Sequence, residues 1–156
     1  KLNNVKTVNS INQIDDKSID IITAWHAIEH VHDIDKLFLE INRVLKNKKF
    51  LYICVPNVDS IEQKYFKEKW VAWDAPRHLY HFNPSFLKKI VEKYNFKVKY
   101  YESLPQDTVY NILLSIDKKS IKNIFKSVFA LVQGYIQMLF SGYTKSSSFI
   151  IVCQKK

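Results

Sequence analysis

The pattern of apolar and polar positions changes period twice between residues 19 and 57. Residues 19–24 are a β-branched apolar run broken only by Asp20 and Thr23, which is typical of a strand buried on both faces. Asp33 then offers a helix N-cap. Behind it, apolar residues recur at helical spacings, at Ile34, Leu37, Phe38, Ile41, Val44 and Leu45. The sequence therefore predicts a strand followed by an amphipathic helix.

A second strand is expected after this helix. The lysines of residues 46–49 gather where the helix should end, and cations there complement the helix dipole. Residues 50–55 form another apolar run of strand length, which Pro56 stops. Strand, helix and strand of this length predict a right-handed βαβ unit in a parallel sheet. Because such sheets bind ligands at the carboxyl ends of their strands, residues 25–30 and Asn57 are expected to carry the chemistry.

The remaining elements follow from the same signals. Asn83 and Pro84 predict a helix start by the N-cap and N1-proline preferences, and Asn95 is expected to end that helix in a left-handed conformation. The further expected elements are a weak helix at 60–70, an aromatic loop at 70–82, a half-exposed strand at 96–101 and a final strand at 148–153.

Residues 104–148 are expected to be a variable helical insertion before the last strand, within a single domain of residues 1–156. They include an apolar helix at 121–140, which opens with Lys122 and Lys126. Such a helix suits a membrane surface, where it would bring the protein to a lipid-like substrate. Packing on the sheet or on a second subunit is the alternative that the sequence favours. No apolar run reaches about 18 residues, so no membrane span is expected.

Charge and cysteine content narrow the class of protein. The net charge is +9, yet Arg43 and Arg77 are the only arginines and the lysines are scattered. Reading of bases and bidentate clamping of phosphates favour arginine, so we expect a solvated lysine-rich surface and no specific nucleic acid, with an anionic partner as the alternative. Cys54 and Cys153 both lie inside apolar runs, which indicates buried, reduced thiols in a cytoplasmic protein.

Four short segments, in this order, are similar to those of one enzyme family. They are Ser-Ile-Asp-Ile-Ile at 18–22, Trp-His-Ala-Ile-Glu-His-Val at 25–31, Val-Pro-Asn at 55–57 and Pro-Arg-His-Leu-Tyr-His-Phe-Asn-Pro at 76–84. With them the chain resembles the C-terminal two-thirds of a class I S-adenosylmethionine-dependent methyltransferase. In particular it resembles the group that includes the ubiquinone-biosynthesis O-methyltransferases.

The resemblance implies a fold, a cofactor and a reaction. The fold is an α/β, Rossmann-like three-layer domain, with a mainly parallel sheet whose last strand is antiparallel. The cofactor is S-adenosyl-L-methionine, and the reaction is methyl transfer to a small-molecule or lipid-like acceptor, at oxygen. The residues expected to contact the cofactor are Ala24, Trp25, His26 and Glu29.

One departure from the family stands out. The family binds its cofactor through a glycine-rich loop, where the backbone must approach the ligand closely, and through an acidic residue that holds the ribose. This chain has no glycine before Gly134, so the domain is expected to be truncated at its N-terminal side and to bind the cofactor weakly by itself. The strand at 19–24 would then have an unpaired edge, which favours self-association, and a homo-oligomer is expected.

His26, Glu29 and His30 form the pattern H-x-x-E-H, which also occurs in a class of zinc proteases. That chemistry needs all three side chains on one sustained helix, whereas here they straddle a strand end. In the ubiquinone-type group, an acidic residue at the position of His26, with Glu and His after it, is associated with a divalent metal. Two imidazoles and a carboxylate would suit a transition metal better than magnesium. The interpretation that we favour is that no metal is held and that Glu29 and His30 line the site.

The candidate catalytic residues are His30, Arg77, His78 and His81. An acceptor hydroxyl or amine must lose a proton during methyl transfer, and a histidine close by can take it. Arg77 could bind an acidic acceptor. The alternative is that these side chains only fasten the aromatic loop to the sheet.

Two further functional classes remain open beside the methyltransferase. The chain could be a non-catalytic remnant or binding module that keeps the acceptor half of the fold. It could also be a metallohydrolase built on H-x-x-E-H, a hypothesis that the position of this pattern at a strand end disfavours.

Overall fold

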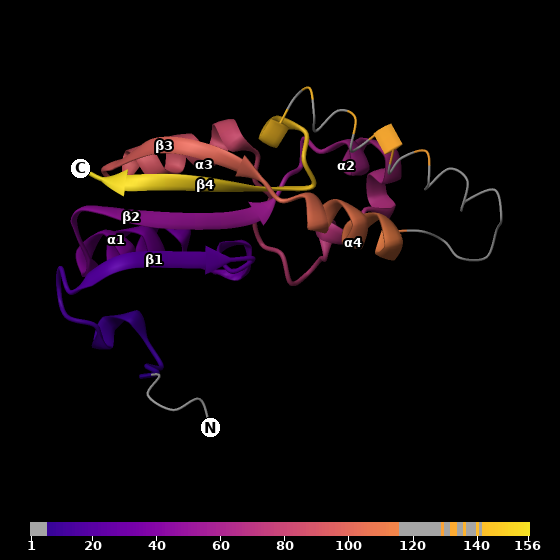
Figure 1. Ribbon diagram of the computed structural model, residues 1–156. Coiled ribbons are helices and arrows are strands. Elements are labelled where there is room, and N and C mark those ends of the chain that lie inside the picture. The colour runs from indigo at the N-terminus through magenta and orange to yellow at the C-terminus, as the bar shows by residue number, and fades with distance from the viewer. Residues whose placement is uncertain (1–5, 116–128, 130–131, 134–135, 137–139, 141) are drawn as a thin grey trace.

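The computed structural model describes residues 6–115, 129, 132–133, 136, 140 and 142–156, drawn in colour in Figure 1. Its centre is one four-stranded sheet with the order β1-β2-β4-β3. The strands are β1 (Ile19–Trp25), β2 (Leu45–Pro56), β3 (Phe96–Ser103) and β4 (Ser148–Lys155). The helices are α1 (Ile34–Val44), α2 (Ile61–Phe66), α3 (Pro84–Lys93) and α4 (Pro105–Ser115).

The directions of the strands confirm the predicted fold class. β1 and β2 pair in parallel, and β4 is antiparallel to both β2 and β3. Three strands therefore run one way and the last strand runs against them, as Figure 1 shows. The expected β1–α1–β2 unit is present, with Ile22 opposite Leu51 and Ala24 opposite Ile53 in its register.

Two helices begin where the local sequence predicts. The Asp33 carboxylate accepts a hydrogen bond from the Lys36 amide at 2.9 Å, and the Asn83 side chain accepts one from the Phe86 amide at 2.8 Å. Asn95 has a φ of 67°, in the expected left-handed region. These caps stabilise the N-terminal ends of α1 and α3. Both helices pack on the same face of the sheet.

That face, which we call the covered face, holds the main hydrophobic core. Leu51, Ile53 and Val55 of β2 point into it and are completely buried. They pack with apolar side chains of α1, α3, β3 and β4, among them Phe38, Leu87, Phe96, Phe149 and Cys153. Alternate residues of the same strands point to the opposite face.

The opposite face, which we call the open face, corrects the prediction for β1. On it Ile21 and Trp25 are 58% and 52% exposed, and Tyr100 of β3 is 46% exposed. The prediction that β1 is buried on both faces is therefore wrong for the described residues. The physical reason is that α1 and α3 both lie on the covered face, so apolar side chains of β1 that point the other way remain in solvent.

The lysines of residues 46–49 also differ from expectation. Helix α1 ends at Val44 and β2 begins at Leu45, so these lysines lie on the strand and not at the helix terminus. Lys46 and Lys49 pair with the Asp20 carboxylate of β1 at 2.8 and 3.0 Å. Cross-strand attraction between opposite charges thus extends β2 beyond its apolar run.

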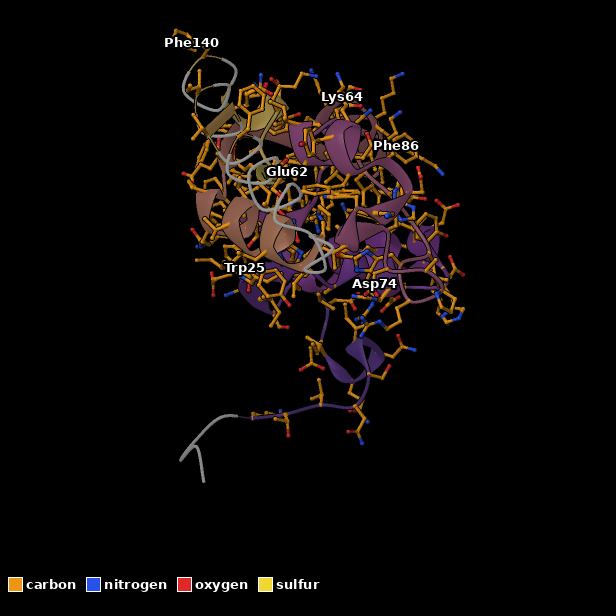
Figure 2. All side chains as sticks on the ribbon, turned by 90° about the vertical axis from the view of Figure 1, so that its right-hand side faces the viewer. Trp25, Glu62, Lys64, Asp74, Phe86 and Phe140 are labelled. Atoms are coloured by element: carbon orange, nitrogen blue, oxygen red, sulfur yellow. The ribbon has the colours of Figure 1, made fainter. Side chains whose placement is uncertain are left out.

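Helices α2 and α4 lie beyond the tips of β1, β2 and β3, at the right-hand end of Figure 1. Figure 2 views the molecule from this end, with Trp25 and Asp74 above the N-terminal segment and Glu62 of α2 higher in the view. Much of the predicted helix at 121–140 lies outside the described residues; its described apolar positions, Phe129, Val132, Ile136 and Phe140, are helical and exposed. No helix within the described part of the chain is long and apolar enough to cross a bilayer.

Candidate functional site

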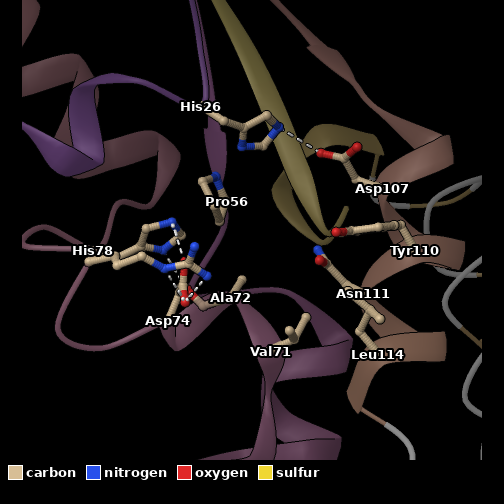
Figure 3. A pocket seen from close by; sticks show the side chains of 11 residues that line it. His26, Pro56, Val71, Ala72, Asp74, His78, Asp107, Tyr110, Asn111 and Leu114 are labelled. Atoms are coloured by element: carbon tan, nitrogen blue, oxygen red, sulfur yellow. Dashed lines mark hydrogen bonds and ion pairs between the residues drawn. The ribbon is translucent and has the colours of Figure 1, made fainter.

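A cavity of about 290 Å³ opens where β1 and β2 end, at the edge of the sheet that the sequence predicts to carry the chemistry (Figure 3). Three parts of the chain line it: the strand ends, the loop that follows α2, and α4. The lining residues are His26, Pro56, Val71, Ala72, Asp74, Arg77, His78, Asp107, Tyr110, Asn111 and Leu114.

His26 follows directly after β1 and is held from three sides. Its φ of 46° is left-handed, and its backbone amide donates to the carbonyl of Cys54 at 3.0 Å. Its ring Nε2 lies 2.9 Å from Asp107 Oδ2 and 3.6 Å from Cys54 Sγ, and Nδ1 lies 3.4 Å from Glu29 Oε1. Figure 3 shows the bond to Asp107 crossing from the strand end to α4.

These partners settle the charge of the ring. The hydrogen bond to Asp107, with smaller contributions from Cys54 and Glu29, raises the pKa of His26 to about 12. Burial is the largest single influence on Asp107 and opposes its ionisation, but the hydrogen bonds to His26 and Ser148 and the charge of His26 together outweigh it and lower the pKa of that carboxyl group. His26 is therefore a cation at neutral pH and does not accept a proton from a substrate.

His78 is the histidine of the aromatic loop that faces the cavity. Its Nδ1 lies 2.8 Å from the carbonyl oxygen of Ala72, so Nδ1 carries the hydrogen and donates it there. In the neutral ring Nε2 then keeps a lone pair, and it lies 3.6 Å from Asp74 Oδ2. The ring is thus held in one orientation, and its basic nitrogen has a carboxylate beside it that can stabilise a positive charge.

The other predicted catalytic residues have different surroundings. Arg77 lines the cavity, is largely exposed and donates from Nε and Nη2 to Asp74 Oδ1 at 3.0 and 2.7 Å. His30 Nδ1 contacts the carbonyl of Arg77 at 3.0 Å, and His81 Nε2 contacts the carbonyl of Trp73 at 3.1 Å. Neither His30 nor His81 lines the cavity; both fasten the loop.

The loop is also fastened through its backbone. The amides of Leu79 and Tyr80 donate to the carbonyl of Glu29 at 2.7 and 3.3 Å, and the Tyr80 hydroxyl donates to the carbonyl of His32 at 3.2 Å. The aromatic loop therefore lies against the segment that follows β1. This geometry supports the fastening role that the sequence left open for these residues, with His78 and Arg77 additionally reaching the cavity.

The four residues expected to contact the cofactor take different positions. Trp25 projects from the open face at the tip of β1, and Ala24 is half-buried, packed on the covered face. His26 lines the cavity. Glu29 is fully buried, and neither carboxylate oxygen has a hydrogen-bond partner among the described residues. Side-chain contact with a ligand is thus open to Trp25 and His26, whereas Ala24 offers its backbone.

Several lining residues were missed by the sequence reasoning. Asp107, Tyr110 and Asn111 come from α4, inside the segment treated as a variable insertion, and Asp74 comes from the aromatic loop. Asp107 lies 81 positions from its partner His26. Pro105 marks a helix start, but no local motif shows which strand end that helix meets.

The H-x-x-E-H pattern does not form a protease-type metal site. Residues Ile28–His30 form only a short 3-10 helix, and His26 lies before it. The ligand atoms separate into two clusters: His26 groups with Cys54 and Asp107, whereas Glu29 and His30 group with His78. The metallohydrolase hypothesis loses its structural basis, because its two histidines do not share one helix face.

The sequence also matches a known protein family over most of the sheet. A model of the methyltransferase domain matches residues 2–101. The chain belongs to this methyltransferase domain family. No curated protein gives a significant match.

Solved structures of similar fold include several S-adenosylmethionine-dependent methyltransferases. One from Thermotoga maritima has 16% identity and a TM-score of 0.60, over 92% of this chain and 58% of its own. One from Archaeoglobus fulgidus has 21% identity and a TM-score of 0.54, over 93% of this chain and 63% of its own. Phosphoethanolamine N-methyltransferase 2 of Haemonchus contortus, solved with S-adenosyl-L-methionine, has 18% identity and a TM-score of 0.53, over 91% and 34%.

These matches confirm the predicted enzyme class at the level of family and fold. The chain spans less than two thirds of the length of these solved relatives. For the cofactor, the described residues fit its adenine end better than its sulfonium. The exposed Trp25 ring offers a surface for stacking, whereas the carboxylates of Asp74 and Asp107 at the cavity are already paired with Arg77 and His26. The glycine-rich loop is not among the 156 residues, since Gly134 and Gly142 are the only glycines.

Proposed function

We propose that this methyltransferase domain transfers the methyl group of S-adenosyl-L-methionine to oxygen of a small-molecule or lipid-like acceptor held in the cavity. The observation that carries the proposal is the orientation of His78 at the cavity wall, with Nδ1 fixed on the Ala72 carbonyl and Nε2 beside Asp74. Bound S-adenosylmethionine supplies a methyl group activated by the sulfonium charge. The residues of this chain supply alignment and a place for the proton.

His78 Nε2 takes the proton of the acceptor hydroxyl in this proposal. A base of this kind contributes about 10²- to 10⁴-fold to the rate of a proton-coupled transfer. Asp74 stabilises the imidazolium that forms, at 3.6 Å from Nε2, while Nδ1 stays on the Ala72 carbonyl. His26 cannot share this role because Asp107 keeps it charged; it orders the wall of the cavity instead.

The other predicted catalytic residues act on the acceptor or on the loop. Arg77, which remains exposed beside Asp74, binds an acidic group of the acceptor. His30 and His81 keep the loop in place through the carbonyls of Arg77 and Trp73, so that His78 faces the cavity. His30 and His81 are therefore positioning residues in this proposal.

Two matched substitutions separate the base from the fastening role. His78→Asn keeps a donor at the position of Nδ1, and so keeps the bond to Ala72, but removes the basic nitrogen. His81→Gln keeps a donor at the position of Nε2, which contacts the Trp73 carbonyl. We expect His78→Asn to lose at least about a hundredfold in kcat and His81→Gln to stay within a few-fold.

The measurement is transfer of labelled methyl from S-adenosylmethionine to hydroxylated and amine acceptors, with the longest natural chain that contains these residues. Equal losses of kcat in His78→Asn and His81→Gln would show that His78 does not act as a base. Labelling of amines but not of hydroxyl acceptors would move the target atom from oxygen to nitrogen, the atom named for the Haemonchus contortus relative.

A non-catalytic binding module is the second candidate, favoured by the absence of any glycine before Gly134. We propose that residues 1–156 alone bind the cofactor weakly, since the usual glycine-rich loop is not among them. Calorimetric titration with S-adenosylhomocysteine tests this. Micromolar binding by these residues alone would show that they form a sufficient cofactor site by themselves.

Partners and location follow as further proposals. The open face and the edge of β1 suit a second copy of the chain, and the exposed apolar positions of 121–140 suit a membrane surface in the cytoplasm. Sedimentation onto anionic vesicles, compared with a Phe140→Ser variant, tests the membrane contact. Phe140 is the most exposed of these side chains, at 86%, and its loss is expected to weaken sedimentation several-fold.

A further inference from the structure

Three side chains with metal-binding atoms lie close together beside the cavity. His26 comes from the residue after β1, Cys54 from β2 and Asp107 from α4. Each offers one ligand atom, and all three atoms lie within 4.8 Å of one another. No local sequence pattern connects them, because they are distributed over 82 positions of the chain, so only the fold shows the cluster.

The separations suit a tetrahedral metal ion. Bond lengths of about 2.0–2.1 Å to nitrogen, 2.3 Å to sulfur and 2.0–2.2 Å to oxygen place N and S about 3.6 Å apart and N and O about 3.4 Å apart around zinc. His26 Nε2 lies 3.6 Å from Cys54 Sγ and 2.9 Å from Asp107 Oδ2. The nitrogen–oxygen distance is about 0.5 Å shorter than zinc requires, so binding requires the Asp107 carboxylate, which lines the cavity, to move outward by that amount.

Glu29 supplies an independent observation at the same place. Its carboxylate is completely buried, has no hydrogen-bond partner among the described residues and points Oε1 at His26 Nδ1, 3.4 Å away. Metal-binding histidines commonly donate their second ring N–H to a carboxylate, which fixes the tautomer and orients the ring. Glu29 is in the position of that second carboxylate.

We propose that His26 Nε2, Cys54 Sγ and Asp107 Oδ2 bind a divalent transition-metal ion of the zinc type, with Glu29 orienting His26. The ion displaces the Nε2 proton of the metal-free ion pair and the proton of the Cys54 thiol, and both protons are released to solvent. Nitrogen, thiolate and carboxylate together favour such an ion over magnesium or calcium. His26 and Asp107 line the cavity and Cys54 is buried, so an ion held by them would be accessible from the cavity to water or an acceptor atom. The earlier expectation of no metal concerned His26, Glu29 and His30, a set of which only His26 is a ligand here.

The competing explanation is a plain ion pair between His26 and Asp107, with Cys54 an inert core thiol. Both explanations need His26 and Asp107, but only the metal site needs the sulfur of Cys54. Cys153 serves as the matched control, because it is also a buried strand cysteine but points to the covered face. The test therefore depends on which thiol responds to metal.

The experiment is a titration of the chain with Co²⁺, followed by competition with Zn²⁺. We expect one ion per chain, an absorption band of thiolate-to-cobalt charge transfer, and visible bands of tetrahedral cobalt. Cys153→Ala should keep all of these. Cys54→Ala should lose the charge-transfer band and weaken binding at least a hundredfold, and Asp107→Asn, which has the same shape, should weaken it at least tenfold. Glu29→Gln should weaken it about 10- to 100-fold.

Two results would overturn the site. One is the absence of a charge-transfer band in the folded wild-type chain at millimolar Co²⁺. The other is a band that persists in Cys54→Ala and disappears in Cys153→Ala. Circular dichroism of each variant confirms the fold, and Asp107→Asn remains informative if Cys54→Ala does not fold. The inference stands apart from the proposed methyl transfer, because the spectrum reports ligation and needs neither cofactor nor acceptor.

Discussion

The two faces of the sheet are built from the same strands but have very different surroundings. On the covered face, Leu51 and Ile53 of β2 have no exposed surface. On the open face, Ile21 of β1 is 58% exposed and Tyr100 of β3 is 46% exposed, although both are large and apolar. The difference shows that apolar side chains allow a strand to be buried, whereas the packing of helices determines which of its faces is buried.

The open face has a buried centre and exposed edges. At its centre Cys54, Ile150 and Val152 form a small buried cluster, with Phe50, Tyr52 and Leu104 packed around it. The exposed residues lie on β1 and β3, which are the two edge strands in the order β1-β2-β4-β3. An apolar face beside an unpaired edge favours association with a further strand or chain. The comparison thus separates a region that stabilises the fold from a region that is free for contact.

The largest expected effect is on the free energy of unfolding, when an isoleucine is replaced on each of the two faces. Ile53→Ala leaves a cavity in the covered core and should lower the free energy of unfolding by about 2–5 kcal/mol. Ile21→Ala removes a side chain that is mostly in solvent and should change it by about 0.5 kcal/mol or less. Urea unfolding at one low protein concentration measures both. Similar losses would mean that the open face is covered in solution.

This contrast also shows how far the sequence could predict the structure. Caps such as Asp33 and Asn83 act within three residues, so the helix starts were predictable, and apolar runs of strand length predicted β1 and β2. A continuous apolar run does not tell whether helices cover both faces, which is why the predicted burial of β1 was wrong. The cavity was predictable at the strand ends, but not its wall of α4, because Asp107 reaches His26 across 81 positions.

The second effect compares the two cysteines, which point to opposite faces. Burial raises the pKa of the Cys153 thiol to about 12, so its neutral form is favoured in the folded protein. That contribution to stability is complete below the ordinary value of 9.0 and is lost as the pH rises through about 12. At pH 9, alkylation of Cys153 should be more than about a hundredfold slower than in the unfolded chain, since the thiolate is the reactive form.

Mass spectrometry of the alkylated peptides distinguishes Cys153 from Cys54. Cys54 lies beside the cavity on the open face and should react first as the native protein opens locally. Modification of Cys153 before Cys54 would contradict the view that the covered face is the more stable of the two.

The third effect concerns contact through the open face. Ile21→Lys places a charge among its exposed apolar residues and should weaken self-association at least tenfold, or about 1.4 kcal/mol. Leu39→Lys is the matched control. Leu39 is about as exposed as Ile21, at 60%, but lies on helix α1 on the other side of the sheet. Analytical ultracentrifugation over a range of concentrations measures the dissociation constants. Equal weakening by both variants would assign the effect to net charge and not to the open face.

The smallest effect is expected outside both faces, where α2 packs on α4. Glu62 is 1% exposed there, and burial, opposed by hydrogen bonds from Thr108 and Ser60, raises its pKa. A raised pKa favours the neutral acid in the fold, so this group contributes stability below the ordinary value of 4.5 and loses it as the pH rises through the folded value. At pH 7 Glu62→Gln should therefore raise the melting temperature by about 2–4 °C or less, whereas at pH 4 the advantage should vanish.

Glu68→Gln, at an exposed position of the neighbouring turn, controls for net charge. If Glu62→Gln instead lowers the melting temperature at pH 7, the ionised carboxylate stabilises the contact between α2 and α4, and the end of the sheet is held by charge and not by packing.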